Sequence, residues 1–304
     1  MVGFLSVKET IEKYIEGCQA KTKLSSKHLL GKAILAGVLI GLGAAASSVA
    51  AHAIGNVGVA RLVAAVVFPV GLMMVIMLGA ELFTGDCLIA MSVMDGKQKI
   101  KDFVRILVVV YIGNFIGASL LAILIGMSGQ LDYSGGLLGA YTIKVALGKV
   151  NISFMQGIVS GILCNVLVCA AVLMAVSAKD IAGKLLAVFF TIMLFVTAGF
   201  EHCVANMYYI TAGILAKSNP QYMQLAMDTY GYTLEQLEGL NITNYLLTNL
   251  VPVTIGNIIG GAVLLGAPMF FLNMNKEKVV KEKPNKEETI NDVIYTTVCA
   301  DSSH

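Results

Sequence analysis

Six long apolar runs alternate with short polar segments along this chain. Each run is longer than the roughly 20 residues that an α-helix, rising about 1.5 Å per residue, needs to cross the hydrocarbon core of a bilayer. The pattern therefore predicts an all-α membrane protein with six transmembrane spans. The apolar runs cover residues 29–54, 62–94, 104–128, 155–178, 185–214 and 247–273.

Basic residues are divided unequally between the two sides that six crossings create. Of the 21 Lys and Arg residues in the chain, all but four fall on the side that carries both termini. The positive-inside rule places that side in the cytoplasm, and we expect the membrane to be the bacterial inner membrane. The residues on the opposite side are Arg61, Lys144, Lys149 and Lys217.

Composition supports a membrane protein. Hydrophobic residues make up 57% of the chain and charged residues 13%, whereas soluble domains carry about 25% charged residues. We expect a cytoplasmic N-terminal segment over 1–27, a transmembrane channel domain over 28–273 and a cytoplasmic polar tail over 274–304. The first segment lacks an apolar core followed by a cleavage site, which argues against a signal peptide.

Two of the six runs contain residues that do not suit a continuous helix. The second run includes Gly-Ala-Glu-Leu-Phe-Thr-Gly-Asp at 79–86, and the fifth includes Gly-Phe-Glu-His-Cys at 199–203. Ionisable side chains at bilayer depth cost roughly 2.5–3.5 kcal/mol on insertion scales. Glycine at that depth lets the backbone leave the helix only where it lines a cavity. Both runs therefore predict broken helices whose ends point into a pathway for a small solute.

The two halves of the chain also repeat each other. Residues 112–118 in the third run, Ile-Gly-Asn-Phe-Ile-Gly-Ala, parallel residues 255–261 in the sixth, Ile-Gly-Asn-Ile-Ile-Gly-Gly. Residues 36–39 in the first run parallel residues 160–163 in the fourth more loosely. Because each half has three spans, the halves insert in opposite orientations. Such an inverted 3+3 repeat, with one broken helix in each half, places its site near the midplane.

Three motifs resemble the formate/nitrite transporter family. They are Gly-Ala-Glu-Leu-Phe-Thr-Gly at 79–85, Gly-Phe-Glu-His-Cys-Val-Ala-Asn-Met at 199–207 and Asn-Leu-Val-Pro-Val-Thr-Ile-Gly-Asn-Ile-Ile-Gly-Gly at 249–261. The resemblance extends over about residues 28–273. It implies an aquaporin-like fold, a homopentamer with one pore in each protomer, and passage of small monovalent anions. The anions passed by the family are formate, nitrite, hydrosulfide and sometimes acetate or lactate.

The resemblance also implies roles for individual residues. His202 is similar to the family's central pore histidine, and Thr84 is similar to the threonine that can hydrogen-bond it. Lys149 resembles the lysine that draws anions into the outer vestibule. The pore-facing asparagines would be Asn165 and Asn257, and the apolar constrictions would contain Phe68, Leu72, Leu82 and Phe195.

A histidine suits the centre of an anion pore because its unperturbed pKa is near 6.5. Desolvation between apolar rings would lower that pKa, and an arriving anion would raise it. We therefore expect His202 to lend positive charge, or a proton, only while an anion lies beside it.

The polar neighbours of these residues allow two interpretations. Glu81 and Glu201 are either proton relays or, as we prefer, structural carboxylates that accept backbone N–H groups exposed at the breaks. Asn114 and Asn257 would likewise cap broken backbone, and for Asn257 the pore and capping roles stay equally open. Lys149 is alternatively an ordinary solvated lysine of a loop.

Other functional classes have less support. We do not expect an enzyme, because the chain contains neither a His-Glu-x-x-His zinc motif nor a Gly-x-Ser-x-Gly nucleophile turn. We expect no cofactor, metal, disulfide or nucleic-acid partner; the partners would be the lipid bilayer and the anion. A proton-coupled carrier of short carboxylates such as acetate or lactate stays the alternative. An aquaporin-type channel for neutral solutes is weaker, because its Asn-Pro-Ala signatures are missing. The sequence leaves the physiological anion open.

Overall fold

The computed structural model describes residues 3–274 of the chain. Every regular element in this range is helical, apart from one isolated β-bridge between Phe4 and Ala178. The fold below is that of the unit ending at Asn273. The predicted polar tail lies outside the described residues, except for Met274.

Long helices alternate with short ones along the described chain. The α-helices are α1 (Val7–Thr22), α2 (Ser26–Ala51), α3 (Val57–Val67), α4 (Val70–Met77), α5 (Phe83–Asp86), α6 (Ala90–Met94), α7 (Ile100–Met127), α8 (Leu137–Val150), α9 (Phe154–Ser177), α10 (Ile181–Ala198), α11 (Cys203–Lys217), α12 (Pro220–Tyr230), α13 (Leu234–Glu238), α14 (Ile242–Asn244), α15 (Val251–Ile258) and α16 (Ala267–Met274). Two 3₁₀ turns, η1 (Cys87–Ile89) and η2 (Gln130–Asp132), and two π-helical stretches, η3 (Tyr245–Leu250) and η4 (Ile259–Gly266), complete the set.

Six stretches of residues 3–274 are long and apolar enough to cross a membrane, which confirms the prediction from hydropathy. They correspond to α2, to α3 with α4, to α7, to α9, to α10, and to the run from α14 to α16. Polar caps set where some of them begin. The Asn56 Oδ1 accepts the Val59 N–H at 3.0 Å, so α3 begins before the run at 62–94 that the sequence predicted.

Both predicted helix breaks are present. Residues 78–82 separate α4 from α5, and residues 199–202 separate α10 from α11. In each break the chain turns at a glycine with positive φ, 65° at Gly79 and 76° at Gly199. Glycine adopts this conformation without the Cβ clash that penalises other residues. The polypeptide therefore leaves the helix at the two places where the sequence combines glycine with ionisable residues.

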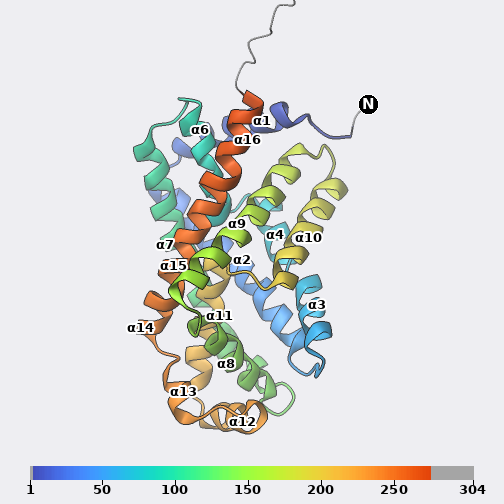
Figure 1. Ribbon diagram of the computed structural model, residues 1–304, viewed down its shortest axis with the longest axis vertical. Coiled ribbons are helices and arrows are strands. Elements are labelled where there is room, and N and C mark those ends of the chain that lie inside the picture. The colour runs from blue at the N-terminus through green and yellow to red at the C-terminus, as the bar shows by residue number, and fades with distance from the viewer. Residues whose placement is uncertain (1–2, 275–304) are drawn as a thin grey trace, which may run out of the picture. The chain divides into compact units, whose positions relative to one another are not determined.

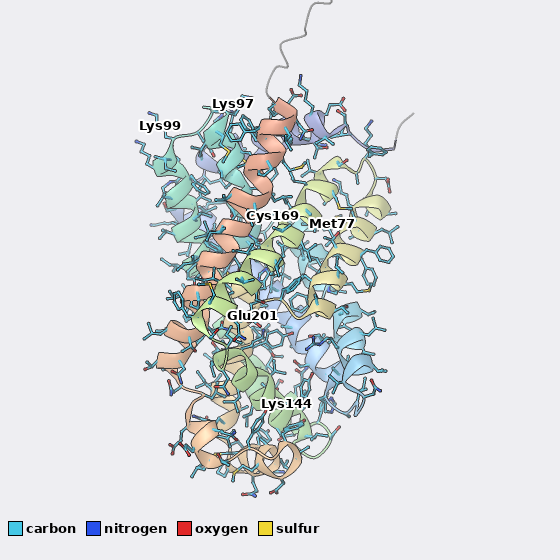
Figure 2. The ribbon with its side chains drawn as sticks, viewed as in Figure 1. Met77, Lys97, Lys99, Lys144, Cys169 and Glu201 are labelled. Carbon is cyan, nitrogen blue, oxygen red and sulfur yellow. The ribbon has the colours of Figure 1, made fainter. Side chains whose placement is uncertain are left out.

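The spans run between two ends of this unit, shown in Figure 1. Helices α1 and α6 lie at one end, which we call the α1 end, and α12 and α13 lie at the other, the α12 end. Lys97 and Lys99 lie at the α1 end, whereas Lys144 lies towards the α12 end (Figure 2). These three basic residues, which the sequence assigned to opposite sides of a membrane, thus lie at opposite ends of the fold.

Glycines bring the first and last spans of each half close together. A Cβ on Gly117 of α7 would lie 2.0 Å from the Ile34 carbonyl oxygen of α2. A Cβ on Gly260 of η4 would lie 2.3 Å from the Ile162 carbonyl oxygen of α9. Gly117 and Gly260 occupy equivalent positions in the Gly-Asn repeat, so Ile34 corresponds to Ile162. The predicted alignment of residues 36–39 with residues 160–163 pairs Ile34 with a residue four positions earlier, and was therefore wrong by one helical turn. A slip of one turn leaves the apolar face of a helix unchanged, which is why hydropathy did not detect it.

The segment ahead of the fourth span is helical. Helix α8 packs on α11, where a Cβ on Gly213 would lie 2.1 Å from the Ala146 side chain. Lys149 belongs to the last turn of α8. The alternative of an ordinary loop lysine was therefore wrong, because Lys149 belongs to a helix, although one too short to span a bilayer.

Candidate functional site

One asparagine holds the first break in place. The Asn114 Oδ1 of α7 accepts the Phe83 N–H at 2.9 Å, at the start of α5. Its Nδ2 donates to the Ala33 and Glu81 carbonyl oxygens at 2.8 and 2.9 Å. Asn114 is fully buried, so one amide satisfies two backbone groups that the break leaves without helical partners, the Phe83 N–H and the Glu81 carbonyl, and also contacts the Ala33 carbonyl within α2.

Asn257 holds the second break in place through equivalent hydrogen bonds. Its Oδ1 accepts the Cys203 N–H at 3.0 Å, at the start of α11. Its Nδ2 donates to the Gly161 and Glu201 carbonyl oxygens at 2.8 and 3.1 Å. Asn257 is fully buried. Its amide groups are therefore engaged with backbone, which is the capping arrangement rather than the pore-facing one.

Asn165 lies between the two breaks. Its Nδ2 donates to the Thr84 carbonyl oxygen at 3.1 Å and to the Asn257 carbonyl oxygen at 2.6 Å. The side chain is fully buried. The predicted pore-facing asparagine thus links the first half-helix to the sixth span.

His202 and Thr84 join the two half-helices. The His202 Nε2 lies 3.0 Å from the Thr84 Oγ1. The His202 Nδ1 accepts the Ala205 N–H at 3.1 Å, so the imidazole is the N-cap of α11. Because Nδ1 is an acceptor, a neutral His202 carries its proton on Nε2 and donates it to Thr84. Charging the ring would place a second N–H against the Ala205 N–H and break the cap.

A cavity of about 150 Å³ opens beside His202, and we call it the central cavity. Phe68 and Phe195 line it with their rings in edge-to-face contact at 5.7 Å, and the Phe195 ring stacks on His202 at 6.0 Å. The other two predicted constriction residues, Leu72 and Leu82, are buried next to these elements. Leu82 is the residue immediately before α5, and His202 is the residue immediately before α11, so the two hold equivalent positions in the two breaks.

A polar cluster surrounds Glu201 at the second break, where Figure 2 shows this residue between α10 and α11. Its carboxylate lies 3.1 Å from the Lys149 Nζ. It also accepts the Asn206 Nδ2 at 2.6 Å and the Asn249 Nδ2 at 3.3 Å. The Lys149 side chain is only 16% exposed. The lysine predicted to attract anions is thus also the partner of a buried carboxylate.

Glu81 has a different partner at the first break. The Lys21 Nζ, which α1 provides, lies 2.6 Å from the Glu81 Oε2 and 2.6 Å from the Asp86 Oδ1. The Lys32 Nζ lies 3.9 Å from the other Glu81 oxygen. Burial lowers the pKa of Lys21, but the two carboxylates outweigh it and hold that pKa above its ordinary value. Lys21 is therefore a cation over the whole physiological pH range.

The two glutamates were expected to accept backbone N–H groups, and that prediction was wrong. In residues 3–274 their carboxylates contact lysine and asparagine side chains, while Asn114 and Asn257 take the backbone groups. Four residues of these clusters were not predicted as site residues, namely Lys21, Asp86, Asn206 and Asn249. Three of them could have been predicted from the sequence, because Asp86, Asn206 and Asn249 adjoin or belong to the quoted motifs.

A larger cavity of about 700 Å³ lies towards the α12 end, and we call it the α12-end cavity. Lys149, Tyr141 and Gly199 line both it and the central cavity, so the two are neighbours. Arg61 and Lys144 add positive charge to its wall, and Glu201 is the acidic residue that lines it. Such a wall raises the local concentration of small anions.

The family model described as "Formate/nitrite transporter" matches residues 8–271. The chain is 38% identical to the formate channel FocA of Haemophilus influenzae over 69% of its length and 73% of the relative's. It is 37% identical to the uncharacterized transporter YrhG of Bacillus subtilis over 92% of its length and 98% of the relative's.

Two solved structures show the same fold. One, described as a pentameric formate channel with formate bound, has a TM-score of 0.73 and 32% identity and covers 82% of this chain and 98% of its own. The other, described as an FNT family ion channel, has a TM-score of 0.72 and 26% identity and covers 87% and 98%. With six apolar spans, two broken helices and a match along nearly the whole described range, this integral membrane protein belongs to the formate/nitrite transporter family.

Proposed function

We propose that the chain is a channel that passes small monovalent anions, namely formate, nitrite or hydrosulfide, through a path in each protomer of a homopentamer. The relatives support this proposal, since they include formate channels and a pentameric channel with formate bound. We also propose a bacterial inner-membrane location with the α1 end in the cytoplasm. Lys97 and Lys99 at that end, together with the excess of Lys and Arg that the sequence assigns to the same side, support this orientation.

The observation that carries the proposal is the hydrogen bond between His202 and Thr84. It joins the starts of two half-helices, whose N-terminal dipoles favour negative charge. An anion that inserts between these side chains would accept the His202 Nε2–H and the Thr84 O–H in place of their mutual bond. Both donors are neutral, so they hold the anion without trapping it as a fixed cation would.

Neutral donors alone do not offset the cost of taking an anion past apolar walls. An isolated charge buried between Phe68 and Phe195 is very unfavourable. Transient protonation of the anion by solvent would remove most of this cost. Because His202 caps α11 through Nδ1, the ring resists carrying a standing positive charge. We therefore assign the proton to water in the cavities rather than to a protonated imidazole.

Formate flux into proteoliposomes, with the internal pH recorded, tests this function. The expected result is uptake of formate that raises internal acidity when formate enters together with a proton. Uptake of acetate or lactate in preference to formate, at a fixed ratio of one proton for each anion, would instead favour the carrier of short carboxylates. Absence of flux for all these anions would contradict both functions. Native mass spectrometry of the same preparation checks the pentamer.

A further inference from the structure

One face of α11 lines the central cavity. The residues on this face are His202, Ala205, Asn206 and Tyr209. Their spacing of three, four and seven residues places them on one side of a helix. His202 is already engaged with the first half-helix, whereas Asn206 and Tyr209 add an amide and a hydroxyl to the cavity wall. The wall therefore offers a small solute polar contacts beyond the imidazole.

The Asn206 amide has an acceptor without a partner. Its Nδ2 donates to the Glu201 Oε2 at 2.6 Å and to the Asn249 Oδ1 at 2.8 Å. The Asn249 Nδ2 in turn donates to the Lys149 carbonyl oxygen at 2.8 Å, so neither amide can be turned round. The Asn206 Oδ1 is buried and has no hydrogen-bond partner among residues 3–274. Since an unpartnered buried carbonyl is costly, this oxygen indicates a ligand that has a hydrogen to donate.

The Tyr209 hydroxyl can reverse the direction of its hydrogen bond. The Ser47 Oγ donates to the Ala44 carbonyl oxygen at 2.8 Å and lies 2.9 Å from the Tyr209 Oη. Because a serine hydroxyl has one hydrogen, Tyr209 then donates to Ser47. If Ser47 donates to Tyr209 instead, the Tyr209 O–H becomes free for a ligand. Helix α2 continues to Ala51, so the Ala44 carbonyl keeps its helical N–H partner in both arrangements.

Neighbouring side chains hold the Tyr209 ring while its hydroxyl changes partner. The Lys149 Nζ lies 5.3 Å from the centroid of the ring, and an ammonium at this distance is attracted by the ring face. The Tyr208 ring contacts it edge-to-face at 5.8 Å. Switching between the two arrangements therefore requires only the rotation of two hydroxyl groups.

We propose that Tyr209 and Asn206 bind the oxygen atoms of a small oxyacid, formate or nitrite, in the central cavity, and that hydrosulfide passes without these bonds. The anion accepts the Tyr209 O–H, and its protonated form also donates its own O–H to the Asn206 Oδ1. Ser47 supplies the hydrogen that Tyr209 needs when it turns to the substrate. The inference rests on the proposed function and deepens it by naming the substrate class. Because Phe68 and Phe195 line the same cavity, these bonds replace hydration where the substrate meets the apolar rings.

The first test is flux through Tyr209→Phe, which loses the hydroxyl but keeps the ring. At low substrate concentration we expect the fluxes of formate and nitrite into proteoliposomes to fall about fivefold, as the loss of one hydrogen bond predicts. Hydrosulfide flux should fall less than about twofold, because sulfur is a weak acceptor. The matched control is Tyr208→Phe, since Tyr208 adjoins Tyr209 and lines neither cavity. This control should leave the ratio of formate to hydrosulfide flux unchanged.

Infrared spectroscopy gives a second readout that does not need transport. In the detergent-solubilised pentamer, addition of formate should shift the phenol C–O stretch of one tyrosine, because the Tyr209 hydroxyl changes partner. We expect this shift in the wild type and in Tyr208→Phe, and its absence in Tyr209→Phe. Ser47→Ala should retain formate flux, since the Tyr209 O–H then has no competing partner.

The two readouts also separate this inference from the proposed function. An unaltered ratio of formate to hydrosulfide flux in Tyr209→Phe would overturn the inference. So would a wild type without the tyrosine shift, or the same shift in Tyr209→Phe. A wild-type protein without any flux would contradict the proposed function alone, because the infrared shift still decides whether formate contacts Tyr209.

Discussion

The two breaks share a scaffold but differ in the residue at their centre. Each has a glycine with positive φ, a glutamate, and an asparagine that caps the following half-helix. The residue before the half-helix is Leu82 in the first break and His202 in the second. The comparison teaches that the repeated residues build the breaks, whereas the chemistry we propose lies at positions where the halves differ, His202 against Leu82 and Thr84 against Val204.

The breaks also differ in what neutralises their glutamates. Glu81 pairs with Lys21 of α1, a helix ahead of the repeat, and shares it with Asp86. Glu201 pairs with Lys149 of α8, which connects the halves, and gains Asn206 and Asn249. The first break is thus tied to the N-terminal helix, and the second to the wall of the α12-end cavity.

The largest expected effect tests whether the two caps are equivalent. Asn114→Ala and Asn257→Ala each leave two buried backbone groups of a break without partners. Each should lower the free energy of unfolding by about 3 kcal/mol, since one such group costs about 1–3 kcal/mol. Thermal unfolding in detergent, followed by circular dichroism, measures this. Losses that differ greatly between the variants would contradict the equivalence.

A somewhat smaller effect is expected at the ion pair of the second break. Lys149→Ala leaves the Glu201 carboxylate buried without its cation, and we expect a loss of about 2 kcal/mol in unfolding free energy. Lys149→Ala/Glu201→Gln should recover at least half of that loss. Any loss of flux that remains in the double variant measures the anion attraction that Lys149 provided. This remaining loss should shrink as salt is added. No recovery in the double variant would show that Lys149 acts without Glu201.

His202→Leu makes the second break resemble the first. We expect formate flux to fall at least about tenfold, equivalent to about 1.4 kcal/mol, because the variant lacks the Nε2–H donor. Loss of the Nδ1 cap should cost roughly 1 kcal/mol of stability. His202→Asn, which offers a cap acceptor in place of Nδ1 but lacks the imidazole, controls for the cap. Wild-type flux through an assembled His202→Leu pentamer would remove the imidazole from the mechanism.

The smallest effect concerns pH. If solvent protonates the anion as it enters the apolar section, formate flux should rise several-fold from pH 7 to pH 5, because neutral acid becomes more abundant. Hydrosulfide, the anion of a much weaker acid, should cross readily at pH 7, and chloride should cross poorly at every pH. Stopped-flow measurements on proteoliposomes give these rates. High chloride flux together with pH-independent formate flux would indicate a simple anion-selective pore.

The sequence by itself determined the six spans, the two breaks and the Gly-Asn repeat. These features depend on local properties: the length of an apolar run, the freedom of glycine at Gly79 and Gly199, and the cost of ionisable groups at membrane depth. The family motifs also brought His202 and Thr84 into one hypothesis, and the structure places them 3.0 Å apart.

Only the tertiary structure decided which distant side chains meet. Lys149 and Glu201 are 52 residues apart, and Asn114 caps an amide 31 residues away. Hydropathy gives the face on which a residue lies but not its partner across the interface. It also cannot fix the register of two packed helices, because a one-turn slip preserves the pattern. Close backbone contacts such as Gly117 against Ile34 set that register, since any side chain larger than hydrogen would collide there.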